Sequence, residues 1–428
     1  MLDDTLLDDP AALQRADHDR ALLALAGSGA RVRTALRLAD AAGLDRLRPD
    51  GRPRAVLVAG HGSALTAGEM LAALAGTASL IAPLPPTDAA PVPRPDRATA
   101  PAAFTAGLAW QLPGWAGPLD LLVVSSAGGG ERGLVALAEQ AYARGCAIVV
   151  TAPEGSPLAE AARQVRALPL PFVPSAVEPG EPGAPGDAGP AAEPDLPPED
   201  PAALWAHLAP LLALTQKLGV TQLAYDALPL TADLLDATAV RCRPDAAAYT
   251  NPAKGLAARL AGTVPLLWAE GPVAGAAAVR FAAQLADRAG RPALAGLLPQ
   301  VLTAHRGMFT GQLGAGADPD DFFRDRVEEP DPLHLQVLLL RQVPGEAPGG
   351  SGDPAGPGEA DGGPAEVPAD DAGPRSFGAT RAHRLAAAHD VRLTEYASHR
   401  SDPLHALADL VALTDFAAVY LGLAAAQS

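Results

Sequence analysis

Two serines and three glycines stand together in "LLVVSSAGGGERG" (residues 121–133), the stretch of this sequence best suited to bind an anion. An apolar run precedes them and a helical pattern follows, which predicts a strand, a glycine-rich turn and the start of a helix. Backbone N–H groups in such a turn, and the dipole of the helix, favour a negatively charged group. Short turns between strands and helices also need glycine for backbone conformation alone, so both interpretations stay open.

A second stretch, "AVLVAGHGSALTAG" (residues 55–68), repeats the pattern of apolar strand, glycine turn and helix. His61 stands between two of its glycines, where it either meets a ligand or is simply part of the loop. Neither stretch has the Gly-Lys-Ser/Thr order of a P-loop or the Gly-x-Ser-x-Gly order of a serine hydrolase, which argues against both activities. The histidines beyond residue 330 have no metal-ligand spacing, so no metal site is expected.

Strands and helices alternate in both halves of the chain. Further apolar strands are predicted at 264–271, 333–342 and 389–398, and a long closing helix at 403–425. Continuous apolar strands between helices are typical of parallel sheets covered on both faces. The fold class is therefore α/β, and ligands are expected beyond the carboxyl ends of the strands.

Two acidic, Pro- and Gly-rich segments interrupt this pattern, residues 174–200 and 344–376. Their composition cannot bury enough apolar surface to order them, so both are expected to be flexible linkers. The predicted domains are therefore residues 1–173 and 201–428, with 174–200 as the linker and 344–376 as an insertion in the second domain. These segments hold most of the formal charge of −17, so a basic face for nucleic acid is not expected.

The composition limits other functions. Lysine occurs only at Lys217 and Lys254, so a catalytic lysine would be one of these. Cys146 and Cys242 form neither a metal-ligand spacing nor a disulfide framework, which suits a reducing compartment. The N-terminus has no secretory pattern, and no uncharged apolar run approaches the ~20 residues that span a bilayer. A soluble cytoplasmic protein without a membrane partner is expected.

Three stretches carry a resemblance to a known family: "TNPAKGLAARLAGTVPLLWAEG", "RFAAQLADRAGRPALAGLLPQ" and "DLVALTDFAAVYLGLA". In order and spacing they resemble the two-domain SIS (sugar isomerase) proteins of the bifunctional phosphoglucose/phosphomannose isomerase type, in an actinobacterial version. The resemblance covers nearly all of the chain outside the acidic segments. It implies two SIS-type αβα sandwiches, a sugar-phosphate ligand, no cofactor and a homodimer.

The resemblance also implies two loops that hold the phosphate. In the second, Ser125 matches the first serine of a Ser-x-Ser-Gly-x-Thr motif, but Ala127 and Gly130 replace the second serine and the threonine. Glu131 adds a competing negative charge at the same helix start. Lys254 is the only lysine of the Asn251–Lys254 segment. Instead of binding a ligand, it could cap its own helix region or pair with a carboxylate. The implied binding residues are Gly60, Gly62, Ser63, Ser125, Gly128, Gly129, Gly130 and Lys254.

Two catalytic residues follow from the same resemblance. Asp287 stands where the family has its glutamate base, and His305 stands near the position of the histidine that opens the sugar ring. Gln300 replaces a glutamate of that turn, and the family's terminal catalytic lysine has no counterpart in "LAAAQS". A surface position without function is the alternative for both Asp287 and His305.

Two functions remain open from the sequence. The first is isomerisation of glucose 6-phosphate or mannose 6-phosphate to fructose 6-phosphate by proton transfer through a cis-enediol. The second is a non-catalytic SIS protein that binds a sugar phosphate or a nucleotide sugar, as a sensor or as a partner subunit. The missing hydroxyl donors favour the second, whereas the two-domain pattern is compatible with both.

Overall fold

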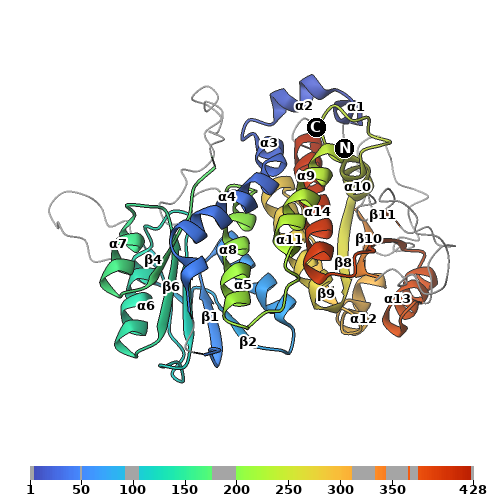
Figure 1. Ribbon diagram of the computed structural model, residues 1–428. Helices are drawn as coiled ribbons and strands as arrows, with labels where there is room; N and C mark the ends of the chain where they lie inside the picture. Colours follow the sequence, from blue (N-terminus) through green and yellow to red (C-terminus); the bar gives the residue numbers. More distant parts are fainter. Residues whose placement is uncertain are drawn as a thin grey trace, which may run out of the picture. The chain divides into compact units, whose positions relative to one another are not determined.

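The computed structural model describes residues 4–48, 51–91, 106–175, 199–310, 333–343, 365–366 and 375–425. The chain forms two compact units (Figure 1), Gly27–Ala232 and the combination of Met1–Ala26 with Asp233–Ser428. Each unit has a largely parallel five-stranded sheet between helices. The predicted α/β class with two αβα sandwiches is confirmed.

The sheet of the Gly27–Ala232 unit has the strand order β2-β1-β5-β6-β7, and all its pairings are parallel. Every residue of β1 and β5 is buried, because helices cover both faces of these central strands. A separate antiparallel pair joins β3 to β4. The strands are β1 (Ala55–Ala59), β2 (Leu80–Leu84), β3 (Asp88–Pro91), β4 (Ala106–Ala109), β5 (Leu121–Ser125), β6 (Ala147–Ala152) and β7 (Leu168–Pro171).

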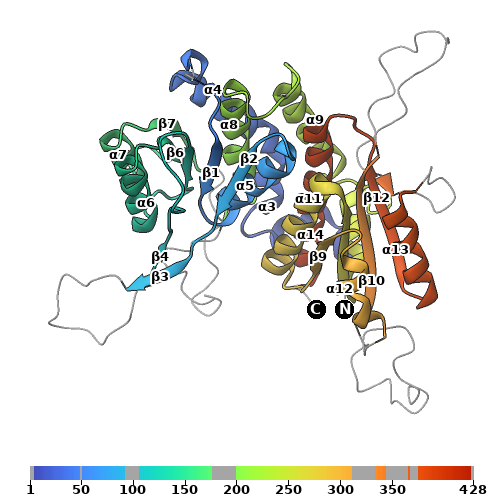
Figure 2. The ribbon, with the colours of Figure 1, turned by 90° about the horizontal axis from the view of Figure 1, so that it is seen from below.

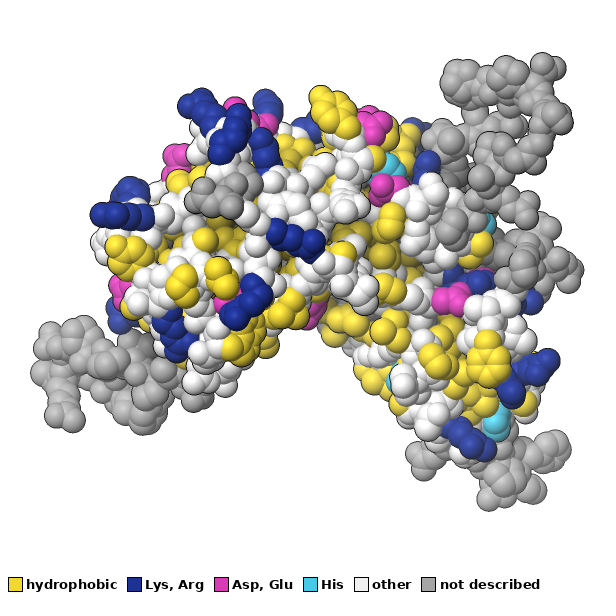
Figure 3. Space-filling model, turned by 60° about the horizontal axis from the view of Figure 1, so that its bottom comes forward, with side chains coloured by type: hydrophobic (Ala, Val, Ile, Leu, Met, Phe, Trp, Pro, Cys, Tyr) yellow, Lys and Arg dark blue, Asp and Glu magenta, His cyan; other side chains and the backbone are white. Residues whose placement is uncertain are grey.

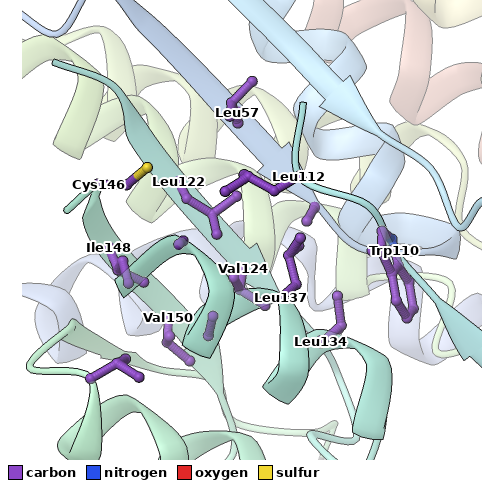
Figure 4. Close-up of a cluster of buried hydrophobic side chains, with 14 of the residues drawn as sticks. Leu57, Trp110, Leu112, Leu122, Val124, Leu134, Leu137, Cys146, Ile148 and Val150 are labelled. Atoms are coloured by element: carbon purple, nitrogen blue, oxygen red, sulfur yellow. The ribbon is translucent and has the colours of Figure 1, made fainter. Parts of the chain in front are cut away.

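Different helices cover the two faces of this sheet. On one face, Leu57, Leu122 and Val124 of the strands pack against Leu134 and Leu137 of a helix (Figure 4). That face carries α6 (Arg132–Ala143) and α7 (Pro157–Gln164), and the other carries α4 (Ser28–Ala41), α5 (Gly62–Ala75) and α8 (Ala203–Lys217). A short 3₁₀ helix, η1 (Leu44–Arg46), follows α4, and α9 (Ala227–Arg241) crosses the boundary between the units.

The sheet of the other unit has the order β11-β12-β10-β8-β9, with four parallel strands and β11 antiparallel at the edge. Leu335, Val337 and Leu339 of β10 contribute to a core with Trp268 and Phe309 on one face. The strands are β8 (Thr263–Glu270), β9 (Leu294–Leu297), β10 (His334–Gln342), β11 (Ala365–Glu366) and β12 (Arg392–Ser398).

Figure 2 shows α13 on one side of β10 and β12, with α11 and α14 on the other side. The helices of this unit are α1 (Asp4–Leu7), α2 (Pro10–Ala16), α3 (Ala21–Ala26), α10 (Pro252–Leu260), α11 (Gly271–Ala289), α12 (Val301–Ala304), α13 (Phe377–Ala388) and α14 (Pro403–Ala425), with the 3₁₀ helix η2 (Arg306–Phe309). By length and composition α14 could cross a membrane, but 89% of its most apolar stretch is buried inside the protein. It packs against α10, α11 and the N-terminal α3.

The compact units divide the chain at other points than the predicted boundaries. Helix α8, predicted to open the second domain, packs on α4 and α5 of the Gly27–Ala232 unit, and the N-terminal helices α1 and α3 contact α14. Of the predicted linker 174–200, residues 176–198 lie outside the described residues. The predicted insertion 344–376 also lies mostly outside them, but residues 365–366 form β11 rather than linker.

Charged side chains stand in small groups among apolar ones on the face of the molecule shown in Figure 3. Lys and Arg (dark blue) and Asp and Glu (magenta) both occur there, so this face mixes the two signs of charge.

Candidate functional site

A cavity of about 200 Å³ lies at the carboxyl ends of β1 and β5, within the Gly27–Ala232 unit. Parallel α/β sheets bind their ligands at this edge. Ser63 and Gly128, both predicted to bind phosphate, line the cavity. The full lining is His61, Ser63, Ala64, Ala127, Gly128, Glu131, Phe172, Pro174, Ser175, Glu199, Asp200, Ala203 and His207.

The loop after β1 leads directly into the N-terminus of α5. Gly62 has a φ of 53°, a backbone conformation that favours glycine, and it places the N–H of Ser63 at the cavity. This N–H donates to both carboxylate oxygens of Glu199, at 2.8 and 2.9 Å. A carboxylate therefore holds the position where a helix N-terminus binds anions.

The loop after β5 is held together by Ser126. The N–H groups of Gly128 and Gly129 donate to Ser126 Oγ, at 3.2 and 2.6 Å, and Ser126 Oγ donates to the carboxylate of Glu131 at 2.7–2.8 Å. Gly130 has no neighbouring atom within 4 Å of the position that a Cβ would take. The glycine N–H donors predicted to hold a phosphate are thus partly used by a hydroxyl of the loop itself.

Glu131 also joins the two loops. Its Oε1 lies 2.9 Å from Nε2 of His61. Burial alone would raise the pKa of Glu131, but the hydrogen bonds from His61 and Ser126 outweigh it, so its pKa lies below the ordinary value. Glu131 is therefore an ionised residue of the cavity lining. The sequence had indicated only that its charge would compete with a phosphate.

Ser125 is paired with His207, a residue of the cavity lining. Its Oγ lies 2.8 Å from Nδ1 of His207, and both side chains are fully buried. The ring of His207 stacks on Phe172, with centroids 4.4 Å apart. Burial lowers the pKa of His207 to about 3, so the imidazole is neutral at neutral pH. A ligand contact by Ser125 stays a prediction.

His207 has one unused hydrogen-bonding group. Its Nε2 is buried and has no hydrogen-bond partner among the residues that the structure describes. His207 also lines the cavity. Since buried polar atoms are normally satisfied, this nitrogen is available to a ligand in the cavity.

The predicted catalytic residues lie in the Asp233–Ser428 part of the other unit. Asp287 is near the end of α11, its side chain is 59% exposed, and Oδ2 lies 2.9 Å from Nε of Arg288. His305 follows α12, and its Nδ1 accepts a hydrogen bond of 3.0 Å from the indole N–H of Trp268. Burial lowers the pKa of His305. A neutral His305 therefore carries its proton on Nε2.

Lys254 is buried at the start of α10. Its Nζ donates to the carbonyl oxygens of Pro244 and Ala246, at 2.6 and 2.8 Å. Burial lowers its pKa, with acidic groups acting in the opposite direction. These contacts anchor the chain before α10 through two carbonyl oxygens, rather than through the ion pair or helix cap considered from the sequence, and the role of Lys254 toward a ligand stays a prediction.

Three features of these sites were missed by the sequence analysis: Ser126, His207 and Glu199. Glu199 fell within the predicted linker and His207 within a helix assigned to the other domain.

A further charged cluster in the other unit was also missed. There Arg341 on β10 bonds to both Glu270 and Glu395, and His383 lies 3.0 Å from Glu395. Among the described residues, no group of His, Cys, Asp and Glu could hold a metal ion.

Comparison with known proteins identifies part of the chain. Residues 249–342 match the family model of the bacterial phospho-glucose isomerase C-terminal SIS domain, and this range includes Asp287 and His305. No curated protein matches the sequence. Over residues 249–342 the expected resemblance is therefore confirmed, at the level of an SIS domain of this bacterial type.

Two solved structures share the fold over nearly the whole chain. One is a hypothetical protein from Thermus thermophilus, with 15% identity and a TM-score of 0.53 over 98% of this chain and 89% of that one. The other is a candidate phosphosugar isomerase from Silicibacter pomeroyi, with 16% identity and a TM-score of 0.51 over 96% of this chain and 98% of that one. At these identities the likeness concerns the fold.

Proposed function

We propose that the protein binds a sugar phosphate and interconverts its aldose and ketose forms without a cofactor. The proposed pair is glucose 6-phosphate or mannose 6-phosphate with fructose 6-phosphate, as in the bifunctional SIS isomerases that the sequence resembles. The observation that carries the proposal is the Trp268–His305 hydrogen bond, because it holds a neutral imidazole as a proton donor inside the segment that matches the SIS isomerase family. A cytoplasmic homodimer belongs to the same proposal.

Aldose–ketose isomerisation needs an acid and a carboxylate base. Ring opening breaks the bond between C1 and the ring oxygen: the Nε2–H of His305 gives its proton to the ring oxygen, and the C1 hydroxyl returns a proton to Nε2 as C1 becomes a carbonyl. The base removes the proton from C2 of the aldose and returns it to C1 through a cis-enediol. Asp287 has a carboxylate for this transfer, and its Oδ2 forms an ion pair with Arg288, whose Nε lies 2.9 Å away. As a separate binding prediction, the loops at Gly60–Ser63 and Ser125–Gly130 of the Gly27–Ala232 unit are expected to hold a phosphate.

A coupled assay of the full chain on glucose 6-phosphate and mannose 6-phosphate tests this assignment. Asp287→Asn and His305→Gln are each expected to lower kcat by about 10²–10⁴-fold, the usual contribution of a general acid or base. Asp390→Asn, which changes an exposed aspartate of the same unit, is the matched control. Turnover by Asp287→Asn at the rate of the wild-type chain would remove Asp287 from the mechanism.

The second candidate is binding of a sugar phosphate or a nucleotide sugar without turnover. The replacement of two hydroxyl donors by Ala127 and Gly130 favours it over turnover. The bonds of Ser63 N–H to Glu199 and of Gly129 N–H to Ser126 reduce the free phosphate donors for either candidate. A chain that shows no turnover but is stabilised by fructose 6-phosphate supports this candidate. A ligand at 100 times its Kd stabilises by about 2.7 kcal/mol. A melting temperature unchanged by fructose 6-phosphate and by a nucleotide sugar contradicts both candidates.

A further inference from the structure

The N-terminus of α5 already binds a carboxylate, that of Glu199. Both oxygens of Glu199 accept from the N–H of Ser63, at 2.8 and 2.9 Å, and Ser63 Oγ lies 3.4 Å from Oε1. The partial positive charge of a 14-residue helix favours an anion at this position. The preceding residue, His61, makes no side-chain capping bond to α5, so Glu199 supplies the negative group at the helix end.

The contact is close because residue 62 has no side chain. A Cβ on Gly62 would lie 1.7 Å from Oε1 of Glu199, so the carboxylate occupies the space that any other residue would fill. An anion thus approaches the backbone here as it does in glycine-rich phosphate loops.

Its neighbour Asp200 fixes the position of Glu199. Asp200 Oδ1 accepts the N–H of Ala202 at 2.9 Å just before α8, and Oδ2 lies 3.2 Å from Arg31 on α4. Arg31 also donates to the carbonyl oxygen of Val173 at 2.6 Å. The residue next to Glu199 is therefore held by contacts to Arg31 of α4 and to the start of α8, and these contacts fix where the Glu199 side chain lies.

A second, independent observation lies beside this position: a cavity with an unpartnered buried nitrogen in its lining. The cavity of about 200 Å³ beside Glu199 is several times the volume of one water. Its wall includes His207, fully buried, whose Nε2 has no partner among the described residues. The helix end and this nitrogen are on the same cavity, together with the paired His61 and Glu131.

We propose that Glu199 is an intramolecular competitor of the ligand: its carboxylate holds the phosphate position at the N-terminus of α5, and a phosphate ester binds there only by displacing it. This inference rests on the proposed sugar-phosphate recognition and names the residue that sets its affinity. The dianionic phosphate and Glu199 exclude each other because they need the same N–H of Ser63 and because both are negative. Glu131, already ionised in the cavity wall, adds to the repulsion.

Titration of the full chain with inorganic phosphate and with fructose 6-phosphate tests the competition. Glu199→Gln keeps the size of the side chain but removes its charge, and it is expected to tighten binding of both ligands by about tenfold, which corresponds to ~1.4 kcal/mol. Glu199→Ala also vacates the position, and its affinity is expected to equal or exceed that of Glu199→Gln. Glu139→Gln, which removes an exposed carboxylate of α6 in the same unit, is the control for net charge and is expected to bind as the wild-type chain does.

The outcomes separate this inference from the proposed function. If the wild-type chain and Glu199→Gln bind fructose 6-phosphate with equal affinity, the competition is overturned while sugar-phosphate binding stands. If neither variant of Glu199 binds either probe, the proposed function fails and the competition fails with it. If Glu139→Gln tightens binding as much as Glu199→Gln does, the effect is one of net charge and the competition is also overturned.

Discussion

Trp268 donates its indole N–H to Nδ1 of His305 over 3.0 Å, and this bond decides which nitrogen of the histidine carries the proton. Trp268 is fully buried on β8, so its position is fixed by the core of its unit. The rings lie 6.4 Å apart and are tilted by 41°, which leaves the hydrogen bond as their directional contact. Trp268 is therefore a positioning residue for His305.

Trp268→Phe is expected to lower kcat by about tenfold with a smaller change in KM, because the imidazole loses the bond that selects its tautomer. The bond from Trp268 stabilises the neutral form of His305, so its loss should raise the pKa of His305. The acid limb of the pH–rate profile, where His305 becomes protonated, should then move to higher pH. A merely structural role would lower stability without moving that limb. The melting temperature and the pH profile of the variant separate the two roles.

The lowered pKa of His207 leads to a prediction of how the stability of the folded chain depends on pH. Its pKa in the folded chain is about 3, below the ordinary value of 6.5, mainly because it is buried. Between these values the unfolded chain binds the extra proton, so this contribution is constant above pH 6.5 and is lost as the pH falls toward 3. The loss is at most about 1.4 kcal/mol per pH unit.

The matched variant for this effect is His207→Asn, whose side-chain oxygen can accept the bond from Ser125 but does not titrate. Urea denaturation of both chains from neutral pH down to about pH 4 is the measurement, since this range spans most of the titration of the unfolded chain. The stability of the wild-type chain should fall more steeply than that of the variant. Parallel curves would mean that His207 takes up its proton over the same pH range in the folded chain as in the unfolded one, which contradicts the lowered pKa.

The sequence was informative about the strands and the loops but not about what the loops contact. Five consecutive buried residues in β1 and in β5 produce apolar runs that predict a covered parallel sheet. A phosphate contact by Ser125 stays a prediction, but its place in the strand indicates which face of the sheet its side chain joins. Side chains alternate along a strand, so Ser125 shares a face with Val123, opposite to Leu122 and Val124. That face is covered, and Ser125 bonds there to His207.

Contacts between distant segments were beyond pattern analysis. Glu199 is 136 residues from Ser63, and it follows an acidic run whose composition predicts no structure at all. Composition identifies residues 174–200 as an acidic segment, but it does not indicate which sheet is covered by the helix that follows. Helix α8 is buried along most of its length and so carries no amphipathic pattern that would indicate its partner, and it packs on α4 and α5.

A buried ion pair joins α11 to α14. Nε of Arg280 lies 3.0 Å from both carboxylate oxygens of Asp415, and the two side chains are 4% and 2% exposed. Asp415→Leu would leave the guanidinium buried without its partner, and a cost of about 3–5 kcal/mol in unfolding free energy is expected.

The double variant Arg280→Met with Asp415→Leu removes both charges together. It should recover most of the stability lost by Asp415→Leu, since no uncompensated charge stays buried. Urea denaturation of the wild-type chain, the two single variants and the double variant measures the coupling. Additive losses would show that the pair contributes through packing alone.

Gly422 allows α14 to approach the end of α11. A Cβ at this position would lie 2.0 Å from the carbonyl oxygen of Arg288, and backbone at that distance can yield only if the helices separate. Gly422→Ala is therefore expected to lower the unfolding free energy by about 1–3 kcal/mol. Gly255 is the matched control, because it lies within α10 and a Cβ there would have no neighbour within 4 Å. Gly255→Ala should raise stability by about 0.5–1 kcal/mol, since alanine loses less backbone entropy in a helix. Denaturation followed by tryptophan fluorescence measures the stability of both alanine variants. A change in the same direction for Gly422→Ala and Gly255→Ala would contradict the close approach of α14 to α11.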